Sequence, residues 1–312
     1  MDTIGSPAAW AGFIAFVIVM LALDLGVFHR KAHEVGFREA LAWSAVWIGL
    51  ALVFNAGVWW TFGSQSGIEF LTGYLIEKSL SIDNIFVFVV IFAALGIPAI
   101  HQHRVLFWGI LSALLLRAAM IFAGVELLAR FHWLIYLFGG FLIVTGIKLY
   151  LQRDKEEHPE SGWAMRTIRR LLPSTPQLHG ERFFVVENGR RLATPLFMAL
   201  MLIEVTDVIF AVDSIPAILA ISTDPFIVFT SNIFAILGLR SLFFLFARLV
   251  DKFRYLKVGL AGVLVFVGAK MAAVDVYKIP PAVSLVIVAF MLGASIVASW
   301  LSARRDAERV EA

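Results

Sequence analysis

Residues 67–95 read GIEFLTGYLIEKSLSIDNIFVFVVIFAAL, an apolar stretch that is long enough to cross a bilayer and yet carries acids near its centre. The pattern E-x5-D-N-I that begins at Glu77 returns as D-x5-D-S-I beginning at Asp207, within a second apolar stretch. A charged side chain at the centre of a bilayer is unfavourable by at least about 2.5 kcal/mol, so acids are rare there and mark functional positions. The repeated acid pair is therefore our first functional-site hypothesis.

The composition excludes an ordinary soluble domain, because 60% of the 312 residues are hydrophobic and only 16% are charged. Apolar runs of about 18 or more residues are typical of helical membrane proteins, whereas β-barrels show weaker alternation in segments of about ten residues. The sequence thus predicts an all-α membrane protein in which residues 1–312 form a single transmembrane domain. Nine spans are expected, at residues 8–27, 39–60, 68–95, 104–128, 131–151, 194–221, 225–247, 255–275 and 281–302.

The distribution of basic residues predicts the orientation of these spans. Of the 26 Lys and Arg residues, 19 fall on one side of the predicted membrane, two on the other and five within spans. By the positive-inside rule the N-terminus is outside and the C-terminus is cytoplasmic. The longest loop, residues 152–193, is then cytoplasmic, and its mixture of eight basic and six acidic residues argues against a nucleic-acid partner. Its end, RFFVVENGRR, contains the turn dipeptide Asn188-Gly189 and is consistent with a small hairpin.

Residues 68–151 and 194–275 align as an internal repeat when the two acid patterns are superimposed. The matched positions are Glu77 with Asp207, Asp83 with Asp213, Arg117 with Arg240, Phe131-x-Trp133-Leu134 with Phe253-x-Tyr255-Leu256, and Gly140-x5-Gly146-x-Lys148 with Gly262-x5-Gly268-x-Lys270. Each unit holds three spans, so the second unit enters the membrane from the opposite side. Spans three to five and six to eight would then be inverted repeats, an arrangement with which transporters expose one central site alternately to each side.

The polar residues of the third and sixth spans form a candidate metal site rich in oxygen. Hard divalent cations such as manganese, magnesium or calcium prefer these ligands, whereas the chain has no Cys and its seven His residues lie in loops or at span ends. The candidate ligands are Glu77, Asp83, Asn84, Glu204, Asp207, Asp213 and Ser214.

Helical geometry restricts how these ligands can meet. Residues six apart differ by about 120° around a helix, so Glu77 and Asp83 cannot share one face of a straight helix. Asn84 falls on the Glu77 face, and Ser214 falls on the Asp207 face. We expect the acids to converge between spans, or at a kink or a short unwound segment. Pro216 is placed to produce such a kink in the sixth span.

A second interpretation is that the acids are neutralised by basic residues and only hold helices together. The expected counter-charges are Lys78, Arg117, Lys148, Arg240 and Lys270. Asp24, in the first span, is equally consistent with the site and with a helix end.

Other function classes fit the residues less well. An oxyanion exporter would use Arg117 and Arg240 as ligands, but acids dominate the centre and repel an anion. Paired acids also occur in intramembrane aspartyl enzymes, yet nothing identifies a substrate. No G-x-S-x-G, H-E-x-x-H or Walker motif is present, so we expect neither an enzyme nor a prosthetic group. A membrane assembly factor, whose polar spans contact other membrane proteins, remains an alternative.

The sequence resembles the TerC family of integral membrane proteins, named for tellurium resistance, and within it the pH-inducible, manganese-exporting subgroup. The resemblance rests on EKSLSIDNIFVF (Glu77 to Phe88), RRLATPLFMALMLIEVTDVIFAVDSIPAILA (Arg190 to Ala220) and SNIFAILGLRSLFF (Ser231 to Phe244). It implies a bacterial inner-membrane protein of about nine spans in which the seven candidate ligands form the ion path. Members of the family are also tied to tellurite resistance and to assembly of membrane proteins. We therefore expect a secondary transporter that exports Mn²⁺, with coupling to protons, and a lipid bilayer and a divalent cation as its partners.

Overall fold

The computed structural model describes residues 3–26, 36–151, 165, 167–168, 170, 172–187, 189–247, 255–277 and 279–311; side chains at 23–26, 82, 83, 86, 213 and 303–311 lie outside this description. The helices are α1 (Pro7–Gly26), α2 (Phe37–Phe62), α3 (Ser64–Ala94), α4 (Ala99–Arg130), α5 (Leu134–Leu151), α7 (Pro195–Leu219), α8 (Pro225–Leu237), α9 (Leu239–Phe246), α10 (Leu256–Ala272) and α11 (Pro281–Glu311). Two strands, β1 (Phe184–Glu187) and β2 (Arg190–Ala193), complete the described elements.

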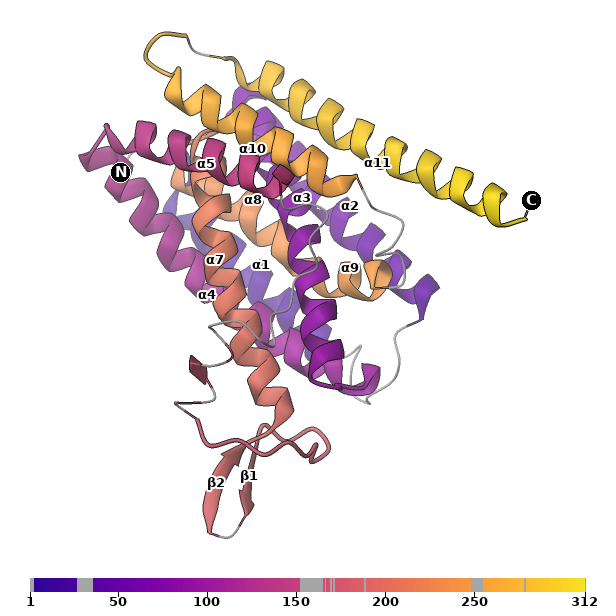
Figure 1. Ribbon diagram of the computed structural model, residues 1–312. Helices are drawn as coiled ribbons and strands as arrows, with labels where there is room; N and C mark the ends of the chain where they lie inside the picture. Colours follow the sequence, from indigo (N-terminus) through magenta and orange to yellow (C-terminus); the bar gives the residue numbers. More distant parts are fainter. Residues whose placement is uncertain are drawn as a thin grey trace.

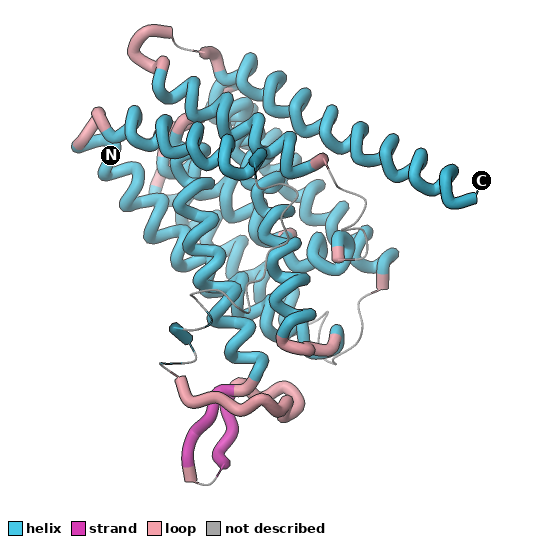
Figure 2. The backbone as a smooth tube through the Cα atoms, in the orientation of Figure 1, coloured by secondary structure: helices cyan, strands magenta, loops and turns pink. Residues whose placement is uncertain are grey.

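Helix α3 lies at the centre of the bundle, where it contacts α2, α7, α8, α9, α10 and α11. Helix α4 packs against α7, and α5 packs along α10. The two strands lie at the end of the bundle opposite the connection between α10 and α11 (Figures 1 and 2). The two acid-bearing helices, α3 and α7, therefore meet in the interior of the molecule, with α4 beside them.

Five helices are long and apolar enough to cross a membrane: α2, α4, α5, α7 and residues 281–302 of α11. A sixth span is present if α8 and α9, which meet at an angle of 41°, count as one. Helix α3 carries Glu69, Glu77, Lys78 and Asp83, α10 has only 17 residues, and the apolar part of α1 is short. Each of the nine predicted segments contains helix, but length and composition alone support five or six spans.

The break between α8 and α9 falls at Gly238, which ends one helix and begins the next. A helix end leaves backbone carbonyls without partners, and Lys78 of α3 satisfies one of them: its Nζ donates to the Ala235 carbonyl oxygen at 3.1 Å. A Cβ at Gly238 would lie 2.6 Å from that Nζ and 3.1 Å from Trp47 Cβ. The absence of a side chain at Gly238 thus lets α3 approach the break.

Helix α8 begins at a well-formed cap. Pro225 occupies its first turn, and the Asp224 carboxylate accepts hydrogen bonds from the backbone N–H groups of Phe226 at 2.9 Å and Ile227 at 3.1 Å. Asp224 also accepts from the backbone N–H of Ile4 at 2.7 Å, so one carboxylate joins the start of the chain to the start of α8.

Helices α5 and α10 approach so closely that their glycines contact backbone of the other helix. A Cβ on Gly146 would lie 2.8 Å from the carbonyl oxygen of Ala261, and a Cβ on Gly268 would lie 2.6 Å from the carbonyl oxygen of Gly139. Small residues of this kind let membrane helices pack backbone to backbone.

These two contacts are reciprocal in the repeat alignment, which matches Gly146 with Gly268 and, in the same register, Gly139 with Ala261. A further neighbour follows the same rule, because Val265 lies against Gly146 and Ile143 lies against Gly268 at matching distances from the added Cβ, 2.8 and 2.9 Å. Matched residues of α5 and α10 thus make the same contacts in both directions, so exchanging the two helices leaves these contacts alike.

Two local predictions have opposite outcomes. The hairpin is confirmed: β1 and β2 pair antiparallel with Glu187 opposite Arg190, and Gly189 in the turn has φ 75°. Of the ways in which the acids could converge, an unwound segment is not found, because the described backbone of α3 and α7 is helical throughout their acid patterns, including at Pro216. The break in the central helices is instead at Gly238, which the sequence reasoning did not single out.

Candidate metal centre

Arg117 of α4 joins the acids of the two repeats. Its Nη1 forms an ion pair with Glu77 of α3, its Nη2 donates to Asp207 Oδ1 at 2.8 Å, and its Nε lies 3.4 Å from Asp207 Oδ2. All three side chains are buried: 1% of the Arg117 side chain is exposed, none of Glu77 and 5% of Asp207. A charge buried in this way is tolerated only when it is paired, so these three residues form one electrostatic unit, which we call the Arg117 centre.

Ser214 completes the α7 side of the centre. Arg117 Nη1 donates to its hydroxyl oxygen at 3.4 Å, and the side chain is 2% exposed. Residues seven apart lie two turns along the same helix face, which is why Asp207 and Ser214 reach one guanidinium. The prediction that Ser214 shares the face of Asp207 is confirmed.

A stripe of buried polar side chains runs along α3 through the same centre. Tyr74, Glu77, Ser81 and Asn84 follow at intervals of three, four and three residues, which places them on one helix face. Each is at most 3% exposed, and each has an oxygen without a hydrogen-bond partner among the described residues. Of the two carboxylate oxygens of Glu77, Oε1 pairs with Arg117 and Oε2 has no partner among the described residues.

Unpaired buried oxygens are energetically costly. Leaving a buried acceptor unsatisfied costs about 1–3 kcal/mol, and few such groups occur in native proteins. Four such side chains in one stripe give α3 a face whose oxygens a ligand could satisfy. Carboxylate, amide and hydroxyl oxygens are the ligands that a hard cation prefers.

Glu204 lies beside the centre and not within its ion-pair network. It is three residues before Asp207 on α7 and half-buried, and its Oε1 accepts a hydrogen bond from the Ser112 hydroxyl of α4. Its Oε2 has no hydrogen-bond partner among the described residues. The side chains of Asp83 and Asp213, the other acids of the predicted site, lie outside the described residues, as does that of Asp24.

The predicted counter-charges are distributed differently. Arg117 is the one that the described structure places against site acids, whereas Lys78 contacts the Ala235 carbonyl and lies 5.8 Å from the centre of the Tyr74 ring. Arg240 is buried in α9, Lys148 is exposed at the end of α5, and Lys270 is half-buried in α10. Among described residues no group of three or more Asp, Glu or His is placed to hold a metal, so the centre offers two carboxylates and neutral oxygens.

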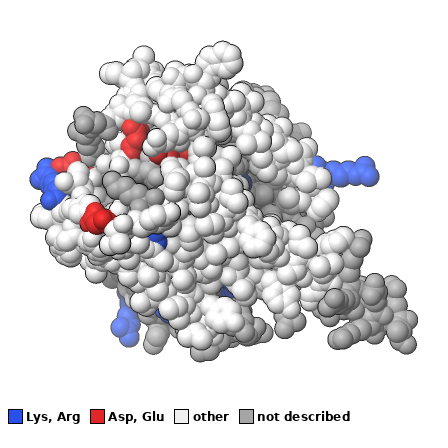
Figure 3. All heavy atoms as spheres, turned by 90° about the horizontal axis from the view of Figure 1, so that it is seen from above, with Lys and Arg blue, Asp and Glu red and all other residues white. Residues whose placement is uncertain are grey.

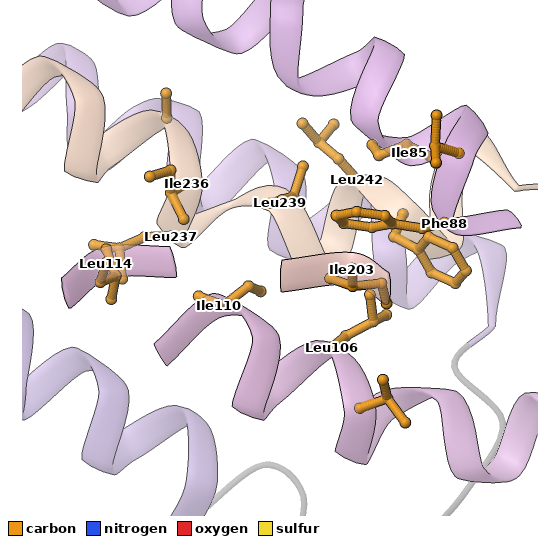
Figure 4. Packing of buried hydrophobic residues seen from close by; sticks show 14 of the residues in the cluster. Ile85, Phe88, Leu106, Ile110, Leu114, Ile203, Ile236, Leu237, Leu239 and Leu242 are labelled. Atoms are coloured by element: carbon orange, nitrogen blue, oxygen red, sulfur yellow. The ribbon is translucent and has the colours of Figure 1, made fainter. Parts of the chain in front are cut away.

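An apolar layer closes one end of the centre. Leu106 and Ile110 of α4, Ile203 of α7, Phe88 of α3 and Leu239 of α9 are buried there in one cluster (Figure 4). Along α4 and α7 these residues precede Arg117 and Asp207, and along α3 they follow Glu77, so the layer lies toward the end of the bundle that carries β1 and β2.

A cavity of about 640 Å³ lies at the opposite end of the bundle. Its lining includes Glu69 of α3, Lys270 of α10, Asp224 before α8 and Tyr277 before α11. Figure 3 looks down on this end and shows acidic side chains gathered on it, with uncharged surface over most of the remainder. Glu69 is two turns of α3 from Glu77, so this cavity ends short of the centre. On the side of the apolar layer, Asp207, Ile110 and Ile203 line a much smaller pocket of about 10 Å³.

Three comparisons relate the chain to known proteins. A family model described as the integral membrane protein TerC family matches residues 62–307. An uncharacterized membrane protein, STKORF319, from Myxococcus xanthus is 72% identical over 302 residues, covering 97% of this chain and 95% of the relative. The "Putative membrane-bound redox modulator Alx" of Escherichia coli K12 is 47% identical over 319 residues, covering 99% of both chains. No solved structure matches.

Proposed function

The chain belongs to the integral membrane protein TerC family, and from this premise we propose that it is a secondary transporter exporting Mn²⁺ across the bacterial inner membrane. The observation that carries the proposal is the Arg117 centre, where Glu77 and Asp207 from two helices are buried beside unpaired neutral oxygens. If the acids formed only a structural ion pair, the buried polar side chains of the α3 stripe would have no explanation. A site for a hard divalent cation accounts for both the acids and the stripe.

The proposed ligand set comprises the acids and neutral oxygens of both repeats. Glu77, Asp207 and Ser214 contact Arg117, Asn84 lies two turns beyond Glu77 on the same face of α3, and Glu204 lies one turn toward the apolar layer. Asp83 and Asp213 belong to the proposed set by the sequence pattern, and each lies about 120° around its helix from the acid at the centre. These residues supply more carboxylates than one divalent ion needs, which motivates coupling to protons: some acids carry protons when no metal is bound.

The transporter architecture that we propose has nine spans with an inverted repeat of spans three to five and six to eight. In this proposal α1, α3 and α10 cross the membrane together with the five or six helices that qualify by length and composition. The reciprocal contacts of α5 and α10 support the repeat, since an exchange of Gly146 with Gly268 leaves their surroundings alike. Helix α3 is polar because it carries the site, and its neighbours bury it on several sides.

The conformation is, in this proposal, open to the outside. With the N-terminus outside, the cavity beside Glu69 and Lys270 faces outward, while the apolar layer at Ile110 and Ile203 separates the centre from the cytoplasm. Alternating access would require that layer to part and the cavity to close. The break at Gly238, next to Leu239 of the layer, is placed to permit that movement.

Arg117 has a defined role in this scheme. When no metal is present, its guanidinium neutralises Glu77 and Asp207, which would otherwise be two uncompensated buried charges. A divalent cation entering the centre replaces part of that positive charge. Binding of the metal and contact with Arg117 are therefore in competition for the same carboxylates.

The proposal is tested by Mn²⁺ flux into proteoliposomes that contain the purified protein and no other. We expect flux from the wild type and at least a tenfold lower rate from Asp213→Asn. The amide keeps the shape of the side chain but removes the negative charge of one proposed ligand. Equal flux from the two proteins, or none from a folded wild type, would reject transport through these acids. Unchanged flux from Asp213→Asn, together with loss of the membrane proteins that co-purify with the wild type, would favour the assembly factor.

The Alx relatives are named for a redox role. Because the sequence contains no Cys, such a role in this chain would not use thiol chemistry.

A further inference from the structure

Asn232 of α8 is a buried amide that neither the ion pairs nor the backbone uses. Its exposure is 0%, and neither Oδ1 nor Nδ2 has a hydrogen-bond partner among the described residues. The neighbouring Thr230 is equally buried, yet its hydroxyl donates to the Phe226 carbonyl at 2.7 Å. Asn232 thus differs from Thr230 and Ser231 of the same helix, whose buried hydroxyls donate to backbone carbonyls of α8.

The packing of α8 on α4 gives the level of Asn232 in the bundle. At one end the ring of Phe229 lies 5.9 Å from that of Phe122, and at the other Leu237 and Leu114 belong to one buried cluster (Figure 4). The two helices are therefore antiparallel, and the two contacts are eight positions apart on each. By this pairing Asn232 lies opposite position 119 of α4, within one turn of Arg117.

The direction of Asn232 follows from its neighbours on the helix. Ser231 faces α3, where a Cβ on Gly73 would lie 3.0 Å from its hydroxyl, and Val228 packs in a cluster with Ile121 of α4. Asn232 is one turn after Val228 and about 100° from Ser231, so it lies on the face that meets α4. Position and direction together bring the amide to the Arg117 centre.

We propose that the Asn232 side-chain oxygen is a ligand of the divalent cation at the Arg117 centre, contributed by the broken helix. This inference rests on the proposed function and adds a residue to its site. A neutral amide oxygen is a hard ligand that binds without a further negative charge, which keeps a centre with two carboxylates near neutrality. Because α8 ends at Gly238, this ligand also connects metal binding to the helix break.

The test compares three variants in the proteoliposome Mn²⁺ assay, together with their thermal stability in detergent. In Asn232→Leu, we expect the apparent Mn²⁺ affinity to fall about tenfold or more, as loss of even a supporting group does at metal sites. Its stability should be unchanged or higher, because an apolar group of similar size replaces an unpaired amide. Thr230→Val, a buried change on the same helix, should keep the wild-type affinity. Asn232→Asp retains a hard oxygen and should keep or raise the affinity.

The outcomes separate this inference from the proposed function. An active wild type whose affinity survives in Asn232→Leu would overturn the role of Asn232 and leave transport intact. A tenfold loss in Asn232→Asp would also overturn it, since that result assigns the role to the amide N–H groups. If the folded wild type shows no Mn²⁺ flux, the proposed function fails and the inference fails with it. Should Asn232→Leu not fold, Asn232→Ala takes its place, and wild-type affinity in that variant would overturn the role of Asn232.

Discussion

Arg117 of α4 donates to Asp207 of α7 with two nitrogens of one guanidinium: Nη2 is 2.8 Å from Oδ1 and Nε is 3.4 Å from Oδ2. The same guanidinium pairs with Glu77 of α3. Two acids from matched positions of the repeat thus share one base, and three helices meet at it. The acids of the sequence pattern are brought together across the bundle, by a residue from a different span.

Replacing Arg117 is expected to destabilise the protein severely. Arg117→Gln leaves two buried carboxylates without their base, and breaking a buried pair in this way costs about 3–5 kcal/mol. The midpoint of thermal unfolding in detergent measures the effect. Arg130→Gln is the matched control, because Arg130 pairs with Glu126 on the surface and such pairs contribute at most about 1 kcal/mol. Adding Glu77→Gln to Arg117→Gln should restore part of the stability, and a further loss in that double variant would contradict the shared-base account.

The close approach of α5 and α10 predicts a contrast between two adjacent glycines. A Cβ on Gly139 would lie 2.8 Å from the carbonyl oxygen of Gly268, whereas one on Gly140 meets nothing within 4 Å. Gly139→Ala should therefore cost about 1–3 kcal/mol through overpacking. Gly140→Ala should be neutral or stabilising by up to about 1 kcal/mol, because alanine favours a helix over glycine. Thermal unfolding in detergent compares the two.

The reciprocity of these contacts adds a second requirement to the same experiment. Gly146→Ala and Gly268→Ala meet matching surroundings, with backbone oxygens at 2.8 and 2.6 Å. Their losses of stability should therefore be of similar size, each about 1–3 kcal/mol through overpacking. A large loss in one and none in the other would contradict the exchange relationship of α5 and α10.

Accessibility to water should differ between the two ends of the centre. The chain has no Cys, so single cysteines can be introduced without first replacing native ones. Thr223 has an exposed side chain that lines the cavity, and Ile110 lies in the apolar layer. The variants Thr223→Cys and Ile110→Cys therefore probe the two ends. A membrane-impermeant maleimide added from outside the cell should label the first and spare the second. Labelling of Thr223→Cys only from the cytoplasmic side would reverse the proposed orientation.

Much of the architecture was predictable because it depends on local sequence. Apolar runs predict the helices, the Asn188-Gly189 dipeptide predicts the hairpin, and a spacing of seven correctly places Ser214 on the Asp207 face. These features need only helical periodicity or turn preference.

The rest depends on contacts between segments that are distant in sequence. The sequence identifies Arg117 as a counter-charge but does not reveal that it serves both Glu77 and Asp207. The sequence around Gly238 reads as one continuous apolar run, whereas the contacts of Lys78 and Trp47 with the break come from other helices. Asn232 gave no signal either, since an unpaired amide is recognisable only when its surroundings are known.

Binding of Mn²⁺ to the purified protein tests the central claim most directly. Electron paramagnetic resonance of a titration reports free Mn²⁺, because bound ions lose the sharp signal of the hydrated ion. We predict that the wild type and Asp275→Asn, a change at an exposed acid beside His132, bind Mn²⁺ alike. The double variant Glu77→Gln and Asp207→Asn, which keeps the shape of both side chains, should lose this binding. Equal Mn²⁺ binding by that folded double variant and the wild type would contradict a cation site at the Arg117 centre.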